Sequence, residues 1–264
     1  SILSEAKSLV ERGTKELLII SQDTSAYGLD LKFEETLING KKLKTNIYNL
    51  VNELASLGIW VRLHYIYPYP HVKQLIPLMD QNRVLPYLDV PFQHAHPDVL
   101  KRMARPSNNV HDLEQISEWR SINPDLSIRS TFIVGFPGET ESEFNFLLDW
   151  LEEAKIDRVG CFKYEDVSGA RSNAMEGHLR DDIIQDRYDR FMSRAQQLSE
   201  LKLKEKIGKT FTCVIDSVEQ DHLICRSIFD APEIDGIVSV SNKQNHHRVG
   251  EHVTVKIIGS SEYD

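Results

Sequence analysis

The sequence is poor in cysteine and has no long apolar run, and both absences narrow the class of protein. Its 264 residues include three cysteines, Cys161, Cys213 and Cys225. They are too far apart for a CxxC or CxxxCxxC motif, and an odd number argues against a disulfide framework. Taken alone, they are expected to be small buried apolar residues. No run of about 18 apolar residues occurs, and the first segment, SILSEAKSLVERG, has an amphipathic helix pattern and not that of a signal peptide. We therefore expect a cytoplasmic protein that does not contact a membrane.

Basic residues are outnumbered by acidic ones. The chain has 31 lysines and arginines against 40 aspartates and glutamates, which gives a net charge of −9. Because phosphate neutralisation needs a basic surface, this balance disfavours a nonspecific hold on nucleic acid and favours a basic protein partner. The sequence also lacks a Walker loop, a GxGxxG and a GxSxG, so none of these motifs identifies the chemistry.

What the sequence does contain is a repeated order of helix and strand. Apolar residues at helical spacing alternate with short apolar runs, and the expected strands span 17–20, 59–66, 84–90, 127–134 and 158–164. Such alternation predicts parallel strands joined by helical crossovers. A long amphipathic stretch, from about residue 180 to 206, follows the last strand.

The faces of these strands distinguish a barrel from a doubly wound sheet. Side chains alternate along a strand, so Trp60, Arg62 and His64 share one face, and Arg129 and Thr131 share one face of the fourth strand. A sheet covered by helices on both sides should be apolar on both faces. A filled barrel would pack its lumen with branched apolar residues. We therefore predict a partial, open barrel with a polar, ligand-filled lumen.

The composition changes after Gly208. Four short β-like runs follow, TFTCVID, HLICRSI, GIVSVS and HVTVKII, separated by turn residues. This pattern predicts a small all-β barrel. The expected domains are therefore 1–206, an α/β partial barrel, and 207–264, a β-barrel.

The ligand site of a parallel α/β fold lies at the carboxyl ends of its strands. In the segment GFPGE, Gly135 and Gly138 would let the backbone approach a ligand, and Arg129 on the preceding strand could pair with an anionic group. An alternative of equal weight is a tight turn before a helix that begins at Thr140, with Glu141 and Glu143 favoured by the helix dipole.

Other polar residues near these ends leave two interpretations open. A buried arginine needs a partner, so Arg62 pairs either with Asp89 or with a ligand carboxylate. His64 and His94 could act in acid/base chemistry or bind metal, although ordinary polar lining is favoured. Five aromatic residues could stack on a flat ring or pack around the barrel mouth: Trp60, Tyr65, Tyr67, Tyr69 and Phe92.

Six segments together resemble one protein family. QDTSAYG, RLHYIYPYPH, LPYLDVPFQHA, RSTFIVGFPGE and VGCFKY, followed by APEIDG, are similar to the radical S-adenosylmethionine (SAM) methylthiotransferases. The resemblance covers essentially the whole chain and is closest to the RimO type, which modifies an aspartate of small-subunit ribosomal protein twelve. It implies a partial (β/α)6 radical SAM barrel followed by a TRAM domain. It also implies transfer of a methylthio group to the aspartate β-carbon by radical SAM chemistry.

The chain departs from this family in its cysteines. Family members carry a CxxxCxxC loop after the first barrel strand and an N-terminal domain with three further cysteines, which together hold two 4Fe–4S clusters. Neither is present here, and the three cysteines occupy none of the cluster positions, so no metal ligand is assigned. The resemblance therefore implies a truncated or partly observed chain that is inactive alone. An electron donor for cluster reduction is an implied partner.

The resemblance implies roles for individual residues, although it identifies no catalytic residue. Gln22 and Asp23 are expected at the SAM amino group, and Arg62 and Arg129 are expected at its carboxylate. Gln93 and His94 are expected on the ribose side. The adenine side is expected to contact Ile133, Val134, Gly135 and Phe136, and Phe162 is expected to be an aromatic residue of the lumen.

A second family type, the MiaB type, methylthiolates a transfer RNA base. Residues 207–264 contain five basic and nine acidic side chains, a net charge of −4. An RNA-binding barrel should be basic, so this charge favours the basic ribosomal protein as substrate and predicts no nucleic acid binding by the TRAM barrel. Asp230, Glu233 and Asp235 are the predicted substrate-binding residues. A non-catalytic fragment that only binds the ribosomal protein is a further alternative.

Overall fold

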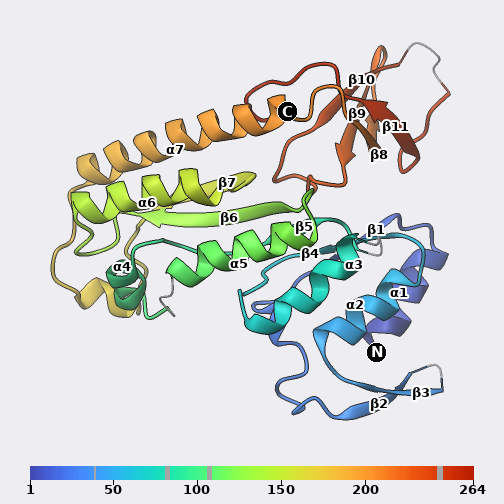
Figure 1. Ribbon diagram of the computed structural model, residues 1–264, viewed down its shortest axis with the longest axis horizontal. Helices are drawn as coiled ribbons and strands as arrows, with labels where there is room; N and C mark the ends of the chain where they lie inside the picture. The colour runs from blue at the N-terminus through green and yellow to red at the C-terminus, as the bar shows by residue number, and fades with distance from the viewer. Residues whose placement is uncertain (39, 81–83, 106–108, 243–245) are drawn as a thin grey trace. The chain divides into compact units, whose positions relative to one another are not determined.

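The structure is a computed structural model that describes residues 1–38, 40–80, 84–105, 109–242 and 246–264 (Figure 1). The chain divides into two compact units. The first comprises Ser1–Val90, Glu118–Ser127 and Thr210–Val255. The second comprises Pro91–Ser117, Ile128–Lys209 and Lys256–Asp264.

Three parallel strands form the α/β part of the first unit. Strand β4 (Trp60–Leu63) pairs with β1 (Glu16–Ile19) on one side and with β5 (Tyr87–Asp89) on the other. Helices α1 (Ile2–Glu11) and α2 (Ile47–Ala55) precede β1 and β4, as predicted. The buried residues of α2 recur at helical spacing and form its core-facing side: Ile47, Leu50, Val51 and Leu54.

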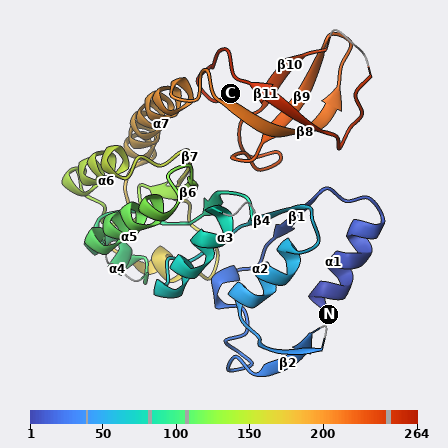
Figure 2. The same cartoon turned by 45° about the vertical axis from the view of Figure 1, so that its right-hand side comes forward.

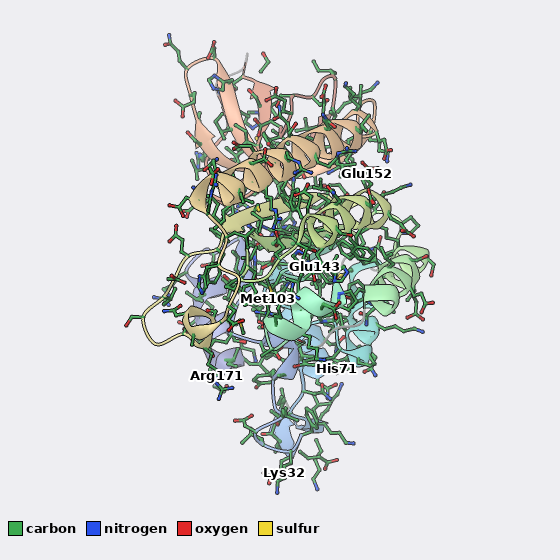
Figure 3. All side chains as sticks on the ribbon, turned by 90° about the vertical axis from the view of Figure 1, so that its left-hand side faces the viewer. Lys32, His71, Met103, Glu143, Glu152 and Arg171 are labelled. Atoms are coloured by element: carbon green, nitrogen blue, oxygen red, sulfur yellow. The ribbon has the colours of Figure 1, made fainter. Side chains whose placement is uncertain are left out.

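Several shorter elements complete this part of the first unit. Strands β2 (Glu35–Ile38) and β3 (Lys41–Lys44) form an antiparallel hairpin that was not predicted, and Lys32 lies in the turn before it (Figure 3). The remaining elements are the 3-10 helices η1 (Thr24–Ala26) and η2 (Pro70–Leu75) and the helix α3 (Ile76–Asp80).

The first unit also contains a four-stranded antiparallel sheet near the C-terminus (Figure 2). Its order is β10-β9-β8-β11, and the predicted β-runs are confirmed as strands. Cys213, Ile215, Leu223 and Cys225 form its buried core. The strands are β8 (Thr210–Val218), β9 (His222–Ser227), β10 (Val238–Ser241) and β11 (His252–Lys256).

The second unit contains a predicted strand of eight residues and two long helices. Strand β6 (Ser127–Val134) has the predicted bounds and pairs in parallel with β7 (Arg158–Lys163). Helices α6 (Glu141–Ala154) and α7 (Asp181–Lys204) pack together along these strands (Figure 1). The other helices in this region are α4 (Pro97–Arg102), α5 (Asn109–Ile122), which continues into the first unit, and the 3-10 helix η3 (Arg171–Ala174).

The two faces of β6 differ as predicted. Phe132 is fully buried, and its ring contacts Trp150 of α6 and Phe191 of α7 at centroid distances of 6.0 and 5.5 Å. On the opposite face, Arg129, Thr131 and Ile133 are only half-buried. The predicted parallel α/β core and the antiparallel sheet that follows it in the chain are confirmed. In the part of the chain that the structure describes, no helix is long and apolar enough to cross a membrane.

Candidate functional site

A buried ionic network lies at the amino ends of the strands in the first unit. Arg62 of β4 is 0% exposed, and its Nε donates to Glu16 Oε1 of β1 at 2.7 Å. The second oxygen of Glu16 accepts from Arg226 Nη1 of β9, also at 2.7 Å. Arg226 in turn forms two hydrogen bonds with Asp216 of β8, at 2.6 and 3.0 Å. One carboxylate therefore joins the α/β part to the C-terminal sheet.

Further contacts join the same strand ends to the segment that follows β9. The hydroxyl of Tyr87 donates to Asp235 Oδ2 at 2.7 Å, and Ser127 Oγ donates to the Phe229 carbonyl at 3.4 Å. Glu16, Tyr87 and Ser127 are the first residues of their strands. The C-terminal sheet is therefore fastened to the amino ends of the strands in this unit, and not to the carboxyl ends, where parallel α/β folds bind ligands.

This network corrects the predicted pairing of Arg62 with Asp89. Arg62 bonds to Glu16 and, through Nη1, to the Ile228 carbonyl at 3.1 Å. Asp89 instead lies 3.3 Å from Nδ1 of His64. Arg62 is the third of the four residues of β4, and tertiary packing places the carboxylate of Glu16, the first residue of β1, against its guanidinium. Of the guanidinium nitrogens of Arg62, Nη2 alone is buried without a hydrogen-bond partner among the described residues.

The predicted substrate-binding acids are not one exposed patch. Asp230 is 3% exposed, and its carboxylate accepts a hydrogen bond from the hydroxyl of Ser227. Asp235 is half-buried and bonded to Tyr87, whereas Glu233 is exposed. The turn after β9 thus uses and buries the Asp230 carboxylate, and binding of a partner by Asp230 stays a prediction.

Two loops follow the carboxyl ends of β1 and β4. Asp23 caps η1 by accepting from Ser25 Oγ at 2.6 Å and from the Ala26 amide at 3.2 Å, while Gln22 beside it is exposed. Tyr65 adopts a left-handed backbone, with φ +52°. Such a conformation is strained for a bulky residue and concentrates at functional sites.

His64 and the predicted aromatic residues divide into buried and exposed groups. His64 is buried, and its Nε2 has no hydrogen-bond partner within the described ranges. Trp60 packs against His252, and Phe92 packs against Trp150 with 6% exposure, so both serve packing. Tyr65, Tyr67 and Tyr69 remain exposed or half-exposed.

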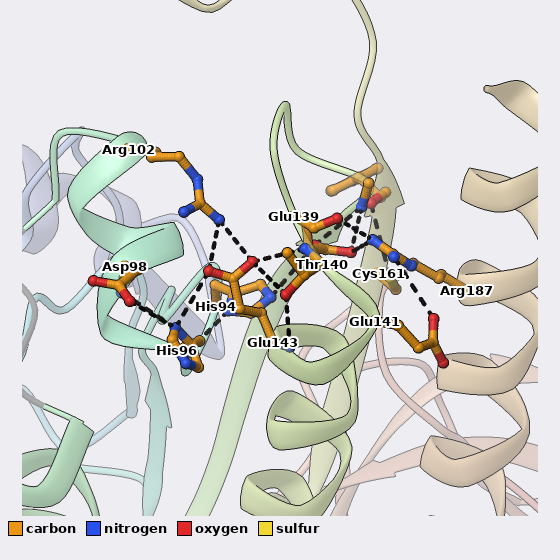
Figure 4. Close-up of polar contacts among 12 residues, drawn as sticks. His94, His96, Asp98, Arg102, Glu139, Thr140, Glu141, Glu143, Cys161 and Arg187 are labelled. Carbon is orange, nitrogen blue, oxygen red and sulfur yellow. Dashed lines mark hydrogen bonds and ion pairs between the residues drawn. The ribbon is translucent and has the colours of Figure 1, made fainter. Parts of the chain in front are cut away.

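In the second unit, the loop GFPGE is organised around a buried carboxylate that the sequence analysis did not single out (Figure 4). The Glu139 side chain is fully buried and accepts hydrogen bonds from the Gly135 amide at 3.2 Å. Arg187 of α7 donates through Nη1 to Glu139 Oε1 at 2.5 Å and to the Glu139 carbonyl at 2.9 Å. Gly135 has φ +81°, and a Cβ there would lie 2.7 Å from Ile184. The close approach at Gly135 is therefore to a helix of this chain.

His94 faces the same carboxylate. It is 1% exposed, its Nδ1 accepts from the His96 amide at 2.9 Å, and its Nε2 lies 3.4 Å from Glu139 Oε2 (Figure 4). Burial lowers the pKa of His94 below the ordinary value, although Glu139 acts in the opposite direction. The imidazole is therefore neutral at pH 7. Because Nδ1 accepts a hydrogen bond, the proton lies on Nε2, which has no hydrogen-bond partner among the described residues.

The helix after the loop begins as the alternative interpretation predicted. Thr140 caps α6 in a capping box with Glu143. Glu143 also accepts two hydrogen bonds from Arg102 Nη2, at 3.0 and 2.9 Å (Figure 4). Burial raises the pKa of Glu143, but hydrogen bonds from Thr140 and Arg102 outweigh it and lower the pKa. His96 and Asp98 lie near enough to share a metal ion with Glu143, but the guanidinium already neutralises that carboxylate.

One face of β6 and β7 is half-buried and carries polar side chains. Thr131 pairs with Gly160 and Ile133 with Phe162, so these four share a face with Arg129. Gly160 leaves this surface flat, since a Cβ there would lie 3.6 Å from Thr131 Oγ1 and 3.8 Å from Arg129 Nη2. Phe162 is 66% exposed. The guanidinium of Arg129 and the ring of Phe162 therefore lie on a flat strand surface, which we call the polar floor (Arg129, Thr131, Ile133, Gly160 and Phe162). Such a surface suits a ligand with a carboxylate and a planar group.

The remaining predicted SAM residues of this unit differ in accessibility. Gln93 is half-buried, has φ +68°, and exchanges backbone hydrogen bonds with Thr131 and Ile133 of β6. Val134, Gly135 and Phe136 are buried. Among these three, only backbone atoms could meet a ligand.

The cysteines do not fit an iron–sulfur cluster. Cys213 and Cys225 lie in the core of the C-terminal sheet, and Cys161 lies on β7 in the other unit. Burial raises the pKa of Cys213 to about 12 and that of Cys225 to about 11, and it also raises that of Cys161. Cluster ligands are thiolates, so these protonated thiols are unsuited to the task. The polar floor of β6 and β7, by contrast, fits the SAM carboxylate and adenine.

Comparison with known proteins gives two family matches in this chain. A family model described as the radical SAM superfamily matches residues 1–151, and a TRAM domain model matches 207–264. The ribosomal protein uS12 methylthiotransferase RimO of Roseobacter denitrificans is 53% identical over 264 residues, and that of a Jannaschia species is 54% identical over 266. Each alignment covers 100% of this chain and 57% of the relative. A relative with the same name from Psychrobacter arcticus is 53% identical, with 51% of its length covered.

The chain thus spans about half the length of the curated relatives it matches. The superfamily match covers more than half of the chain and includes β1, β4, β5 and β6. The chain belongs to the radical SAM superfamily, whose members use SAM and an iron–sulfur cluster.

Proposed function

We propose that this chain is the SAM-binding and substrate-docking part of a RimO-type methylthiotransferase. The whole enzyme adds a methylthio group to the β-carbon of an aspartate in ribosomal protein uS12. The observation that supports this best is the polar floor of β6 and β7, where Arg129 and Phe162 flank Gly160 in a chain that is 53% identical to a uS12 methylthiotransferase.

In this proposal, the predicted residues contact different parts of SAM. Arg129 holds the carboxylate, because Arg62 already bonds to Glu16. Ile133 and Phe162 cover the adenine side. For Gln22 and Asp23, contact with the amino group stays a prediction from the family resemblance. When bound, SAM supplies a 5′-deoxyadenosyl radical; the chain's own residues bind it, orient it and exclude water.

Backbone and buried groups support the pocket in this proposal. Gln93 and His94 lie on the ribose side, where the neutral ring of His94 is held against Glu139. Val134, Gly135 and Phe136 contribute backbone atoms.

The proposal also includes parts that this chain does not supply. Two 4Fe–4S clusters, held by cysteines of the whole enzyme, and an electron donor complete the reaction. The domains divide near residue 206, in keeping with the separate family matches to 1–151 and 207–264. A ribosomal substrate places the enzyme in the cytoplasm.

The charge of residues 207–264 supports a protein substrate over transfer RNA. Glu219, Asp221 and Glu251 are exposed acids, and Glu233 is another. Arg226, one of the five basic residues in this range, is buried in the network with Glu16. The exposed surface is therefore more acidic than RNA binding allows.

Direct binding measurements test this function. Isothermal titration of the chain with SAM should give a saturable heat, and Arg129→Ala should weaken binding about ten- to a hundred-fold because a charge-assisted pair is lost. Arg171→Ala, at an exposed position in the same unit, is the matched control and should match the wild type. No SAM binding, or equal effects of both substitutions, would refute the assigned pocket. Transfer RNA bound more tightly than uS12 would favour the MiaB-type alternative.

A further inference from the structure

A row of stacked aromatic rings follows the carboxyl end of β4. Tyr67 and Tyr69 lie 6.2 Å apart between ring centroids with an interplanar angle of 23°, and Tyr69 and His71 lie 5.5 Å apart at 22°. Tyr69 is 39% exposed and His71 is exposed as well. We call Tyr67, Tyr69 and His71 the aromatic ladder. Its rings are stacked on one another and open to solvent, unlike the packed rings of Trp60 and Phe92.

Hydrogen bonds to the loop after β1 hold the aromatic ladder in place. The Tyr69 hydroxyl donates to Asp23 Oδ2 at 2.9 Å, and His71 Nε2 bonds to the Ser25 carbonyl at 2.8 Å. The Tyr67 amide donates to Ser25 Oγ at 3.0 Å. Pro68 and Pro70, which alternate with the rings, restrict the backbone further. Rings fixed in this way lose little entropy when a partner binds.

The charge next to the aromatic ladder indicates which sign of charge a binding partner should carry. The described contacts of Asp23 are with neutral donors, and no salt bridge to it occurs within the ranges that the structure describes. Its negative charge therefore stays close to the Tyr69 ring, and the ring face is itself negative. Both features attract a cation and repel a phosphate.

We infer that the aromatic ladder binds an arginine-bearing segment of a basic protein, with guanidinium planes stacked on the tyrosine rings. Under the proposed function, on which this inference rests, that protein is uS12. Arginine fits better than lysine because its planar, weakly hydrated head stacks on an aromatic face. The ladder lies after the carboxyl end of β4, the side where parallel α/β folds bind ligands.

The test compares binding of two forms of uS12 to variants of this chain. Fluorescently labelled uS12 is titrated with wild-type chain and with Tyr67→Leu/Tyr69→Leu, which keeps apolar volume but removes both rings. We expect the double variant to bind about five- to thirty-fold more weakly, as the loss of two exposed cation–π contacts implies. The second form is uS12 with its arginines enzymatically deiminated to citrulline, which is neutral and of similar size. It should bind the wild type weakly and should not distinguish the variant.

Two matched controls separate the ladder from general effects. Tyr48→Leu removes a ring that is 36% exposed on α2 of the same unit and should bind uS12 as the wild type does. Tyr69→Phe keeps the ring but loses the bond to Asp23, so it should retain most of the affinity. Unchanged thermal unfolding of the double variant shows that the fold is intact.

Other outcomes would overturn the inference. These are equal affinity of the wild type and the double variant, undiminished binding of deiminated uS12, or no binding of uS12 to the wild type. A short single-stranded RNA that binds the wild type and loses affinity in the double variant would assign the ladder to nucleic acid instead. Titration of the wild-type chain with SAM judges the proposed function separately, because that measurement involves neither uS12 nor the substituted rings.

Discussion

At the scale of single residues, Glu139 determines the geometry of the loop after β6. Its buried carboxylate accepts the Gly135 amide and pairs with Arg187 of α7. Replacement by alanine would remove the buried acid of the Arg187 guanidinium, which is 5% exposed, and would leave it the exposed Glu141 at 3.6 Å. We expect Glu139→Ala to lower the free energy of unfolding by about 3–5 kcal/mol, the usual result of breaking a buried ion pair. Urea denaturation at pH 7 measures this change.

The control for Glu139 lies on the adjoining helix. Glu153 is exposed on α6, so Glu153→Gln should change the free energy of unfolding by less than about 0.5 kcal/mol. Equal effects of the two substitutions would show that Glu139 is not the organising residue. A Glu139→Gln variant, which can still accept the Gly135 amide, should lose less stability than Glu139→Ala.

His94 predicts a pH dependence of stability. Burial lowers its pKa in the folded state below the ordinary value of 6.5. The unfolded chain therefore takes up a proton at a higher pH than the folded chain does. Stability is fully present above pH 6.5 and falls as the pH drops toward the folded-state pKa, by up to about 1.4 kcal/mol per pH unit. The unfolding free energy at pH 5.5 should thus be about 1 kcal/mol below that at pH 7.5 because of this residue alone.

Substitution isolates this contribution. His94→Gln should show a smaller loss between pH 7.5 and pH 5.5 than the wild type, whereas His246→Gln, at an exposed position, should show the wild-type loss. If His94→Gln and the wild type lost stability equally over this interval, the neutral state of His94 would be disproved.

At the scale of elements, the alternation of side chains along each strand predicted which residues share a face. It did not predict which partner each charged side chain contacts. Strand β6 was predicted to the residue because its faces differ clearly over eight positions. Strand β5 is shorter than predicted, because Pro86 and Pro91 flank it and proline cannot donate to a ladder. The partner of Arg62 could not be predicted, since Glu16 lies 46 positions away and only tertiary packing brings them together.

The hairpin of β2 and β3 and the role of Glu139 were missed for different reasons. The hairpin is largely exposed and charged, so it lacks the apolar alternation that identifies a strand. Asn39-Gly40 is a typical hairpin signal, although residue 39 lies outside the described residues. Glu139 stands in a loop of glycines, where an acid is as readily solvated as buried, so its burial depends on α7.

The connection between β1, β4 and β9 gives an element-scale prediction. Glu16 bridges Arg62 and Arg226, and the side chains of all three are at most 9% exposed. Glu16→Gln should therefore lower the free energy of unfolding by about 3–5 kcal/mol, because two buried guanidinium groups lose their shared charge. In a double-mutant cycle, Glu16→Gln and Arg226→Gln should be non-additive by about 1–3 kcal/mol. Glu233→Gln, exposed in the segment after β9, is the matched control. Additive effects would mean that the bridge does not couple the sheet to the C-terminal strands.

At the scale of the whole molecule, the proposed function predicts that this chain binds SAM but does not cleave it. The proposed binding surfaces are the half-buried face of β6 and β7 and the loop after β4. Cluster binding, by contrast, depends on thiolates, and the thiols of this chain are held protonated by burial, with the pKa of Cys213 near 12. A protein of this kind should bind the cofactor and the substrate yet leave SAM intact.

Anaerobic reconstitution with iron and sulfide tests this separation. We expect the chain to retain iron well below one cluster per molecule, to show no cluster absorbance, and to form no 5′-deoxyadenosine from SAM and dithionite. A variant with alanine at Cys161, Cys213 and Cys225 is the matched control and should retain the same background iron, because none of the three thiols is suited to be a ligand. If the wild type bound a stoichiometric cluster and the variant did not, the conclusion that burial prevents these thiols from binding metal would be wrong. Formation of 5′-deoxyadenosine would then show that this chain cleaves SAM by itself.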